Sequence, residues 1–155
     1  MDVKVAKTAG FCFGVKRAVE EVYKVAETTK GTVYTYGPII HNEEVVSDLE
    51  KKGVKVLETE EDLKNLTEGT VIIRSHGVPK YIYELLEERN ISYVDVTCPF
   101  VLKIHRIVEK ESAQGKHIVI VGDPNHPEVV GIKGWCQRKA TIIKTKEDAK
   151  SFLAE

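Results

Sequence analysis

The sequence has few cysteines, and none of them lie close together. Only Cys12, Cys98 and Cys136 occur in 155 residues, and there is no C-x-x-C pair. An odd number of widely spaced cysteines disfavours the disulfide framework that small secreted domains use to replace a large core. The first segment, MDVKVAKTAG, also lacks the apolar stretch of a signal peptide. We therefore expect a cytosolic protein.

The sequence also lacks an excess of charge and a long apolar run. It has 23 Lys and Arg against 24 Asp and Glu, with a net charge of −1. This balance argues against bulk electrostatic binding to nucleic acid. No apolar run approaches the roughly 18 residues of a membrane span. The length and the apolar fraction of 42% predict a globular protein of one domain or two small ones.

Helical and strand patterns alternate along the whole chain. Apolar residues recur at helical spacing over residues 14–29, and further helices are expected at 41–53, after Thr59, after Pro79, at 100–113 and at the end. Pro79 is expected in the first turn of its helix. Strands are expected at 32–36, 54–57, 70–74, 91–96, 117–121 and 140–143. This alternation predicts an α/β fold with parallel sheets.

An internal repeat divides the sequence into two similar parts. The phrases YTYGPIIHNEEVV and VIVGDPNHPEVV match, and their histidines, His41 and His126, are 85 residues apart. The phrases TEEDLKNL and TKEDAKSF begin at positions 59 and 145, which are 86 residues apart. We interpret residues 1–96 as one α/β unit and residues 97–155 as an incomplete second copy.

Two of the cysteines hold equivalent positions in this repeat. Cys12 and Cys98 are 86 residues apart, and each precedes a helical pattern. Symmetry between the units would bring both thiols toward a common axis, and a helix N-terminus favours the thiolate. The pair suggests a metal site, and the alternative is two buried thiols without ligand function. Cys136 has no counterpart in the first copy, so we expect it to be structural.

Three histidines follow predicted strands in similar surroundings. His41, His76 and His126 occur in GPIIHN, RSHGVP and PNHPEVV, and a helical pattern follows each. Ligands of open α/β sheets bind beyond the carboxyl ends of the strands, and helix N-termini favour anions. The three imidazoles are therefore candidates for binding a phosphate or diphosphate, although a single histidine at such a place is more often a turn or capping residue. His105, in mid-helix, and His117, which opens a strand, are expected to be structural or solvated.

Glu128 is a candidate proton donor. It stands two residues after His126, and its counterpart in the first copy is Glu43. A glutamate at a helix start is commonly a surface charge that the helix dipole favours. Beside a histidine and an anion site, it is also able to act as a general acid.

Five phrases, in order, resemble the motifs of one enzyme family. FCFGVKRAV, GPIIHN, RSHGVP, DVTCP and HPEVVG, between residue 9 and about residue 131, are similar to the motif set of the 4-hydroxy-3-methylbut-2-enyl diphosphate reductases, the LytB/IspH family. That family catalyses the last step of the methylerythritol phosphate route to isoprenoids. The resemblance implies three similar α/β units around a pseudo-threefold axis, with an iron–sulfur cluster at the centre.

The resemblance also implies roles for the candidate residues. Cys12 and Cys98 would be two of three cysteine ligands of a [4Fe–4S] cluster. A cluster with three cysteines keeps one iron open for the substrate hydroxyl. His41, His76 and His126 would line the pocket for the substrate diphosphate.

The implied reaction removes the hydroxyl of an allylic diphosphate and yields isopentenyl and dimethylallyl diphosphate. Ferredoxin or flavodoxin would donate the electrons, and His126 and Glu128 would relay protons. The third unit and its cysteine are absent from the 155 residues. The chain therefore resembles the amino-terminal part of such an enzyme.

Two other functions are compatible with these residues. One alternative is that the chain by itself is a non-catalytic fragment, which binds neither cluster nor substrate well. The histidines and Glu128 are also a candidate zinc site for hydrolysis, but their spacings are long and no H-x-x-x-H pair occurs. Anaerobic iron–sulfur reconstitution distinguishes these possibilities.

Overall fold

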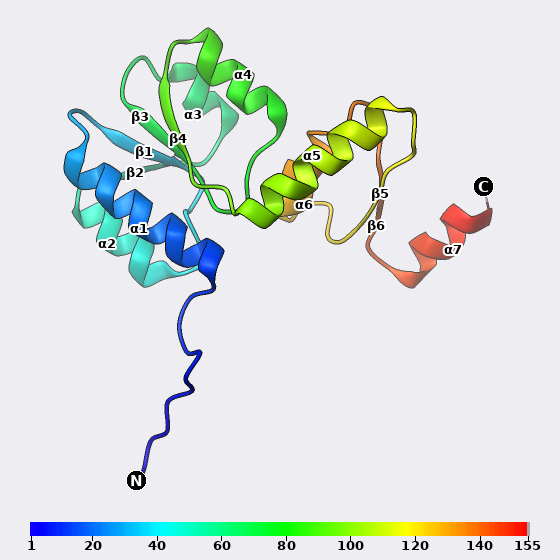
Figure 1. Cartoon of the computed structure of the whole chain (residues 1–155). Coiled ribbons are helices and arrows are strands. Elements are labelled where there is room, and N and C mark those ends of the chain that lie inside the picture. The colour runs from blue at the N-terminus through cyan, green and yellow to red at the C-terminus, as the bar shows by residue number, and fades with distance from the viewer. Residues whose placement is uncertain (155) are drawn as a thin grey trace.

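The computed structural model describes residues 1–154 and shows helices and strands in alternation (Figure 1). The elements in chain order are α1 (Phe13–Thr28), β1 (Val33–Tyr36), α2 (Glu43–Lys51), β2 (Lys55–Leu57), α3 (Glu60–Asn65), β3 (Thr70–Ile73), α4 (Lys80–Glu88), β4 (Ser92–Asp95), α5 (Pro99–Ala113), β5 (Val119–Val121), α6 (Pro127–Lys133), β6 (Thr141–Ile143) and α7 (Lys146–Ala154). All strand pairs are parallel, so the predicted α/β class with parallel sheets is confirmed.

The first sheet has helices on both faces. Its strand order is β2-β1-β3-β4. Successive side chains of a strand point to opposite faces, so Ile72 packs into the core under α1 and α2, whereas Val71 and Ile73 pack under α3 and α4. All three are fully buried. This arrangement leaves the carboxyl ends of β1 and β3 side by side at one edge, where ligands of such sheets bind.

A second, smaller sheet repeats part of the first. β5 pairs with β6 as β1 pairs with β2, and the order α5-β5-α6-β6-α7 copies α1-β1-α2-β2-α3. The copy extends to single hydrogen bonds. The amide of Gly37 donates to the carbonyl of Leu57 (2.7 Å), and the amide of Gly122 donates to that of Ile143 (3.0 Å).

The start of α7 also copies the start of α3. The amide of Asp62 donates to Thr59 Oγ1 at 3.1 Å, and the amide of Thr59 donates back to the Asp62 carboxylate at 2.8 Å. Thr145 and Asp148 make the same two bonds at the same distances. These capping boxes satisfy amides that a helix start leaves free. The repeat is therefore present in the backbone, while the boundary between residues 96 and 97 stays a prediction.

Two local expectations were wrong. Pro79 is the N-cap of α4 and not part of its first turn, because its ψ of 151° is extended. His117 lies before β5 and does not open it. Its Nε2 is 2.8 Å from Thr141 Oγ1, and its ring stacks on Phe152.

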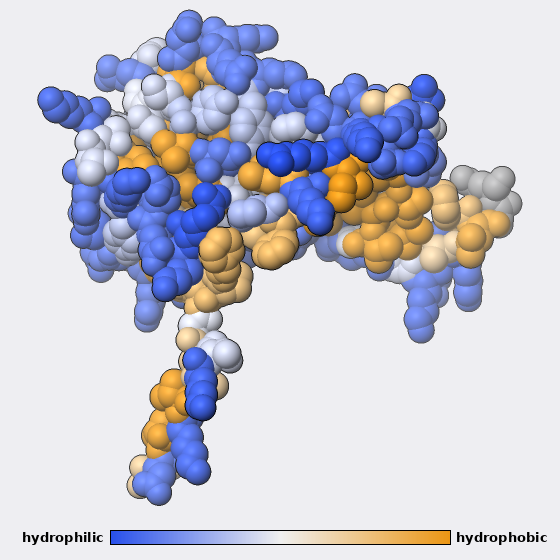
Figure 2. Space-filling model, viewed as in Figure 1, coloured by the Kyte–Doolittle hydropathy of each residue, from blue (hydrophilic) through white to orange (hydrophobic). Residues whose placement is uncertain are grey.

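The amino-terminal residues 1–9 extend away from the body as an exposed arm (Figure 1). Figure 2 shows hydrophobic surface where this arm joins the body. Phe11, Phe13 and Phe100 are among the exposed large apolar side chains. In the part of the chain that the structure describes, no helix combines the length and the apolarity of a membrane span.

Candidate functional site

Three loops at strand ends bring His41, His76 and His126 together. They follow β1, β3 and β5 respectively. The ring centroids of His41 and His76 are 4.6 Å apart, and that of His126 lies 6.3 Å from His41 and 6.0 Å from His76. The first two loops come from one sheet and the third comes from the other, so the cluster spans both sheets.

Local hydrogen bonds hold the histidine loops. Asn42, directly after His41, caps α2 by accepting from the amide of Val45 at 3.0 Å. Ser75, directly before His76, donates its hydroxyl to the carbonyl of Ile39 at 3.1 Å. The Ser75 bond joins the two loops of the first sheet, so His41 and His76 are fixed relative to each other.

The third imidazole has a capping role as well. His126 is the N-cap of α6, and its Nδ1 accepts from the amide of Glu128 at 3.2 Å. This bond assigns the neutral tautomer with its proton on Nε2 when no other group binds. It also places the half-buried Glu128 beside His126.

The electrostatics of the cluster favour an anion. Burial, together with the nearby charges of His41, Arg74 and His126, lowers the pKa of His76 to about 4. Its Nδ1 is buried and has no hydrogen-bond partner among the described residues. An anion placed beside His76 would supply the missing partner and favour the protonated form of His76. Anion binding at this site should therefore take up protons.

Cys12 and Cys98 are the N-cap residues of α1 and α5. A side-chain carbon added at Gly14, in the first turn of α1, would lie only 2.5 Å from Cys98 Sγ. The Cys98 thiol therefore lies against the turn that follows Cys12. Two further bonds fix this approach, since Arg17 Nη2 donates to the carbonyl of Thr97 (2.7 Å) and the amide of Cys98 donates to that of Ser75 (2.9 Å).

A hollow of about 230 Å³ lies between the start of α1 and two of the histidines. It is lined by Phe11, Val15, Ile40, His41, Asn42, Ser75 and His76. A second hollow, of about 330 Å³, is lined in part by His126 and Glu128. A larger hollow of about 500 Å³ runs along α2, but Glu43 and Glu50 line it, and carboxylates there disfavour an anion. The hollow between α1 and the imidazoles of His41 and His76 has no carboxylate among its lining residues and is therefore the candidate anion site.

Comparison with known proteins identifies the family. The family model described as LytB protein matches residues 3–155. The chain belongs to the LytB protein family.

Curated LytB relatives carry one enzyme name. The 4-hydroxy-3-methylbut-2-enyl diphosphate reductase of Caldanaerobacter subterraneus is 53% identical over 98% of this chain, and the one of Alkaliphilus oremlandii is 51% identical over 96%. The matched region is 53% and 52% of those two proteins. This chain therefore spans about half the length of the curated relatives that it matches.

Solved structures of the same enzyme have this fold. A structure of (E)-4-hydroxy-3-methyl-but-2-enyl diphosphate reductase, described as the terminal enzyme of the non-mevalonate pathway, is 41% identical with a TM-score of 0.82, and the match covers 99% of this chain and 54% of that one. A structure of E-1-hydroxy-2-methyl-but-2-enyl-4-diphosphate reductase from Plasmodium falciparum is 30% identical with a TM-score of 0.85, with 93% and 45% covered.

Arg74 is a residue of this LytB chain that sequence reasoning missed. Arg74 is half-buried, and its guanidinium lies so close to Gly37 that a side chain at Gly37 would overlap it. Burial lowers the pKa of Arg74, but an arginine stays charged at any ordinary pH. It therefore adds a fixed positive charge beside His76. The available signal was an arginine immediately after the apolar run TVII.

The remaining candidates lie outside the histidine cluster. Cys136 packs against the core of the second sheet, and its thiol donates to the carbonyl of Ile132 at 3.7 Å. His105 is not solvated, because it is only 1% exposed and stacks on Trp135. Among residues 1–154, no three or more His, Cys, Asp or Glu side chains are grouped to hold a metal ion. The zinc hypothesis therefore gains no support from the geometry of these residues.

The buried His105 predicts that the protein loses stability on acidification. Burial lowers its pKa to about 4 from 6.5, and Asp95 opposes this only in part. Between these two pH values the unfolded chain binds a proton that the folded chain excludes, so acid favours unfolding. The loss should reach up to about 3 kcal/mol across that window, because each pKa unit is worth about 1.4 kcal/mol. Urea unfolding across this pH range measures it.

The variant His105→Leu should reduce this pH dependence, since leucine has no proton to bind, while the part that comes from His76, whose pKa is also lowered to about 4, should remain. His117→Leu, at an exposed histidine, serves as the matched control and should leave the slope unchanged. Equal slopes in wild type and His105→Leu would show that His105 is not the titrating group.

Proposed function

We propose that this chain forms part of a reductase that converts 4-hydroxy-3-methylbut-2-enyl diphosphate to isopentenyl and dimethylallyl diphosphate. One observation carries the proposal. Three imidazoles have ring centroids 4.6–6.3 Å apart, and two of them, His41 and His76, line a hollow that Phe11 and Val15, on either side of Cys12, also line. The substrate has a diphosphate that must be bound and an allylic end that must react. The histidines would bind the diphosphate, and the cysteines at the starts of α1 and α5 would lie toward the allylic end.

The histidine cluster would bind the diphosphate. His41, His76 and His126 would donate hydrogen bonds from their ring N–H groups to its charged oxygens, His126 through Nε2 because its Nδ1 accepts from the amide of Glu128, and Arg74 would add positive charge beside His76. Holding the diphosphate at this wall directs the allylic end of the substrate toward the thiols and restricts its motion. The exposed phenylalanines beside both cysteines offer an apolar surface for the hydrocarbon part.

Glu128 and His126 would handle protons. Removal of a hydroxyl as water requires a proton, and Glu128 is half-buried beside His126 in one hollow. In its acid form the Glu128 carboxyl would transfer that proton. The imidazole of His126 would connect Glu128 with the bound diphosphate.

The cysteine pair fits two of the ligands of a [4Fe–4S] cluster. Thiolate is the ligand that iron–sulfur clusters use, and both thiols lie at helix starts, where the dipole favours the thiolate. Gly14 leaves room for the Cys98 sulfur where any side chain would collide with it. When bound, the cluster would supply electrons and a Lewis-acidic iron for the allylic hydroxyl. A third ligand would come from outside these 155 residues, and ferredoxin or flavodoxin in the cytosol would be the electron donor.

Replacing His76 by alanine tests the anion site. The chain should bind inorganic diphosphate, and His76→Ala should weaken that binding. Loss of one charged hydrogen bond costs roughly 1.5–3 kcal/mol, or about 10- to 100-fold in Kd. Isothermal titration measures the affinity. Titration in two buffers of different protonation enthalpy should also show the proton uptake expected from the depressed pKa of His76.

The control for this experiment is His117→Ala, which removes an exposed imidazole just before the second sheet. It should bind diphosphate as the wild type does. Equal affinities in both variants would contradict the site.

Anaerobic reconstitution with iron and sulfide tests the proposed cofactor. A brown, oxygen-sensitive chromophore on this chain would support cluster binding by the pair alone. A colourless product would support the alternative of a fragment that needs more chain. Tightly held zinc would favour the hydrolase.

A further inference from the structure

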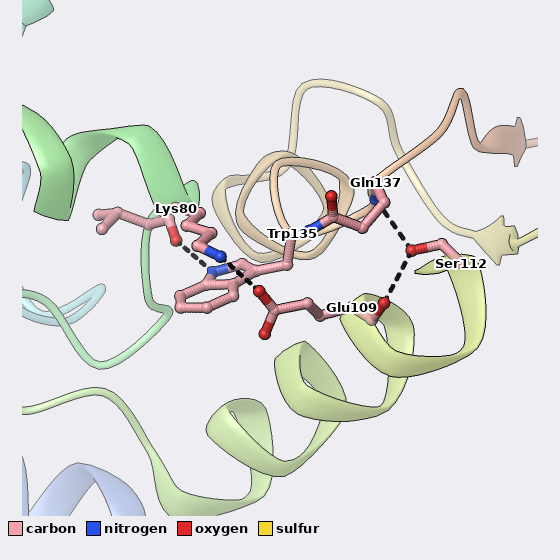
Figure 3. A network of polar contacts seen from close by, with 6 residues as sticks. Lys80, Glu109, Ser112, Trp135 and Gln137 are labelled. Atoms are coloured by element: carbon pink, nitrogen blue, oxygen red, sulfur yellow. Dashed lines mark hydrogen bonds and ion pairs between the residues drawn. The ribbon is translucent and has the colours of Figure 1, made fainter. Parts of the chain in front are cut away.

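The segment just after His76 is bonded to residues of the second unit, and Figure 3 shows Lys80 with its partners there. The indole Nε1 of Trp135, just after α6, donates to the carbonyl of Val78 at 2.9 Å. Lys80 forms an ion pair with Glu109 of α5 at 2.5 Å, and its ammonium lies 5.8 Å from the centre of the Trp135 ring. These contacts join segments that are 57 and 29 residues apart.

His105 of α5 fills the space directly behind His76. A side-chain carbon at Gly77 would lie 2.6 Å from its Cε1, so the ring touches the backbone next to His76. The φ of Gly77 is +72°, which also favours glycine. On its other side the His105 ring stacks on Trp135, with centroids 5.2 Å apart and planes 16° apart. The His105 ring thus lies between the backbone of Gly77 on one side and the ring of Trp135 on the other.

The short helix α6 connects this stack to the third imidazole. His126 is its N-cap, and Trp135 follows its C-cap residue, Gly134. Gly134 packs so closely on Pro79 that a side chain there would overlap the proline. Any movement of Trp135 away from the loop of Val78 and Pro79 therefore moves α6, and His126 with it.

The segment after Trp135 is tied to α5 as well. The Ser112 hydroxyl accepts from the amide of Gln137 at 2.9 Å and donates to the carbonyl of Glu109 at 3.1 Å (Figure 3). Glu109 is also the partner of Lys80. Lys80, on the Val78 side of the Trp135 hydrogen bond, and Gln137, on the Trp135 side, are thus both bonded to α5.

We propose that Trp135 is a positioning residue, which acts through the Val78 carbonyl and His105 to set the distance between His76 and His126. The ligand part of this inference rests on the proposed function, since the two imidazoles would share one diphosphate. Trp135 lines neither hollow at the histidines. Trp135 would therefore affect binding only through the fraction of molecules in which His76 and His126 lie at the distance that binds diphosphate.

The test is Trp135→Phe in this chain, with two readouts. Phenylalanine keeps a ring for the stack but lacks the N–H that bonds to Val78. The first readout needs no ligand and is the nuclear Overhauser contact between the imidazoles of His76 and His126. We expect it to weaken, while the contact between His41 and His76 stays unchanged, because both belong to the first sheet. The second readout is the Kd for inorganic diphosphate, which should rise about fivefold, as for a competent population that falls to about a fifth.

Ile132→Val is the matched control, because it loses one methyl group from the core of the second sheet on the same helix. It should leave the imidazole contacts unchanged and alter the Kd less than twofold. Retained contacts and an unchanged Kd in Trp135→Phe would overturn the proposal, as would equal effects in both variants. If the wild-type chain binds no diphosphate, the proposed function fails. In that case the first readout still tests Trp135. Loss of the contact between His76 and His126 in Trp135→Phe supports the positioning role, and retention of this contact overturns it.

Discussion

Replacing Cys98 by serine should abolish cluster incorporation in a protein that joins this chain to the carboxyl-terminal half of its 53%-identical Caldanaerobacter relative, here called the extended protein. Iron in such clusters is held by thiolate, and a serine hydroxyl keeps its proton under the same conditions. The same loss is expected for Cys12→Ser. Iron and acid-labile sulfide, measured after anaerobic reconstitution, give the result without any assay of activity.

Cys136→Ser is the matched control in the extended protein. Burial raises the pKa of the Cys136 thiol, so it favours the protonated form, which is a poor metal ligand. Its thiol is also engaged with the carbonyl of Ile132. This variant should keep its full iron and sulfide content. Full incorporation in Cys98→Ser would remove that thiol from the proposed ligand set.

The class of fold, and the edge of the sheet at which the candidate site lies, could be predicted from the sequence. Helical and strand periodicities are local, so the alternation of elements could be predicted before any packing was known. The repeat predicted that Cys12 and Cys98 occupy equivalent helix starts, and both are N-caps. Parallel strands end at one edge of a sheet, which predicted that the loops of His41 and His76 would meet.

Contacts between the two units could not be predicted in this way. A periodic pattern says which face of α5 is buried, but it does not say what lies opposite. The stack of His105 on Trp135 depends on how α5 and α6 approach the loop of Gly77. For the same reason, His105 was expected to be structural or solvated without a partner being named. Arg74 was missed because its importance lies in its position against Gly37 and beside His76.

Glu128→Gln in the extended protein should keep substrate binding but lower turnover steeply. Glutamine preserves the shape and much of the hydrogen bonding, and it removes the acid. General acid catalysis typically contributes about 10²- to 10⁴-fold, so kcat should fall by that factor while the Kd for substrate stays within a few-fold. Steady-state rates with a chemical reductant, together with a direct binding titration, separate the two effects.

The repeat provides the control for this experiment. Glu43 stands two residues after His41, as Glu128 stands two residues after His126, and both are acidic residues in the first turn of a helix. If Glu128 were only a charge favoured by the helix dipole, both glutamine variants would lose about 0.3–1 kcal/mol of stability and keep normal rates. Glu43 is exposed and lines the hollow along α2, whereas Glu128 is half-buried beside His126. A large loss of turnover in Glu128→Gln but not in Glu43→Gln would therefore identify a proton donor. Equal, near-normal rates would remove Glu128 from the mechanism and leave His126, or a water chain, as the proton source.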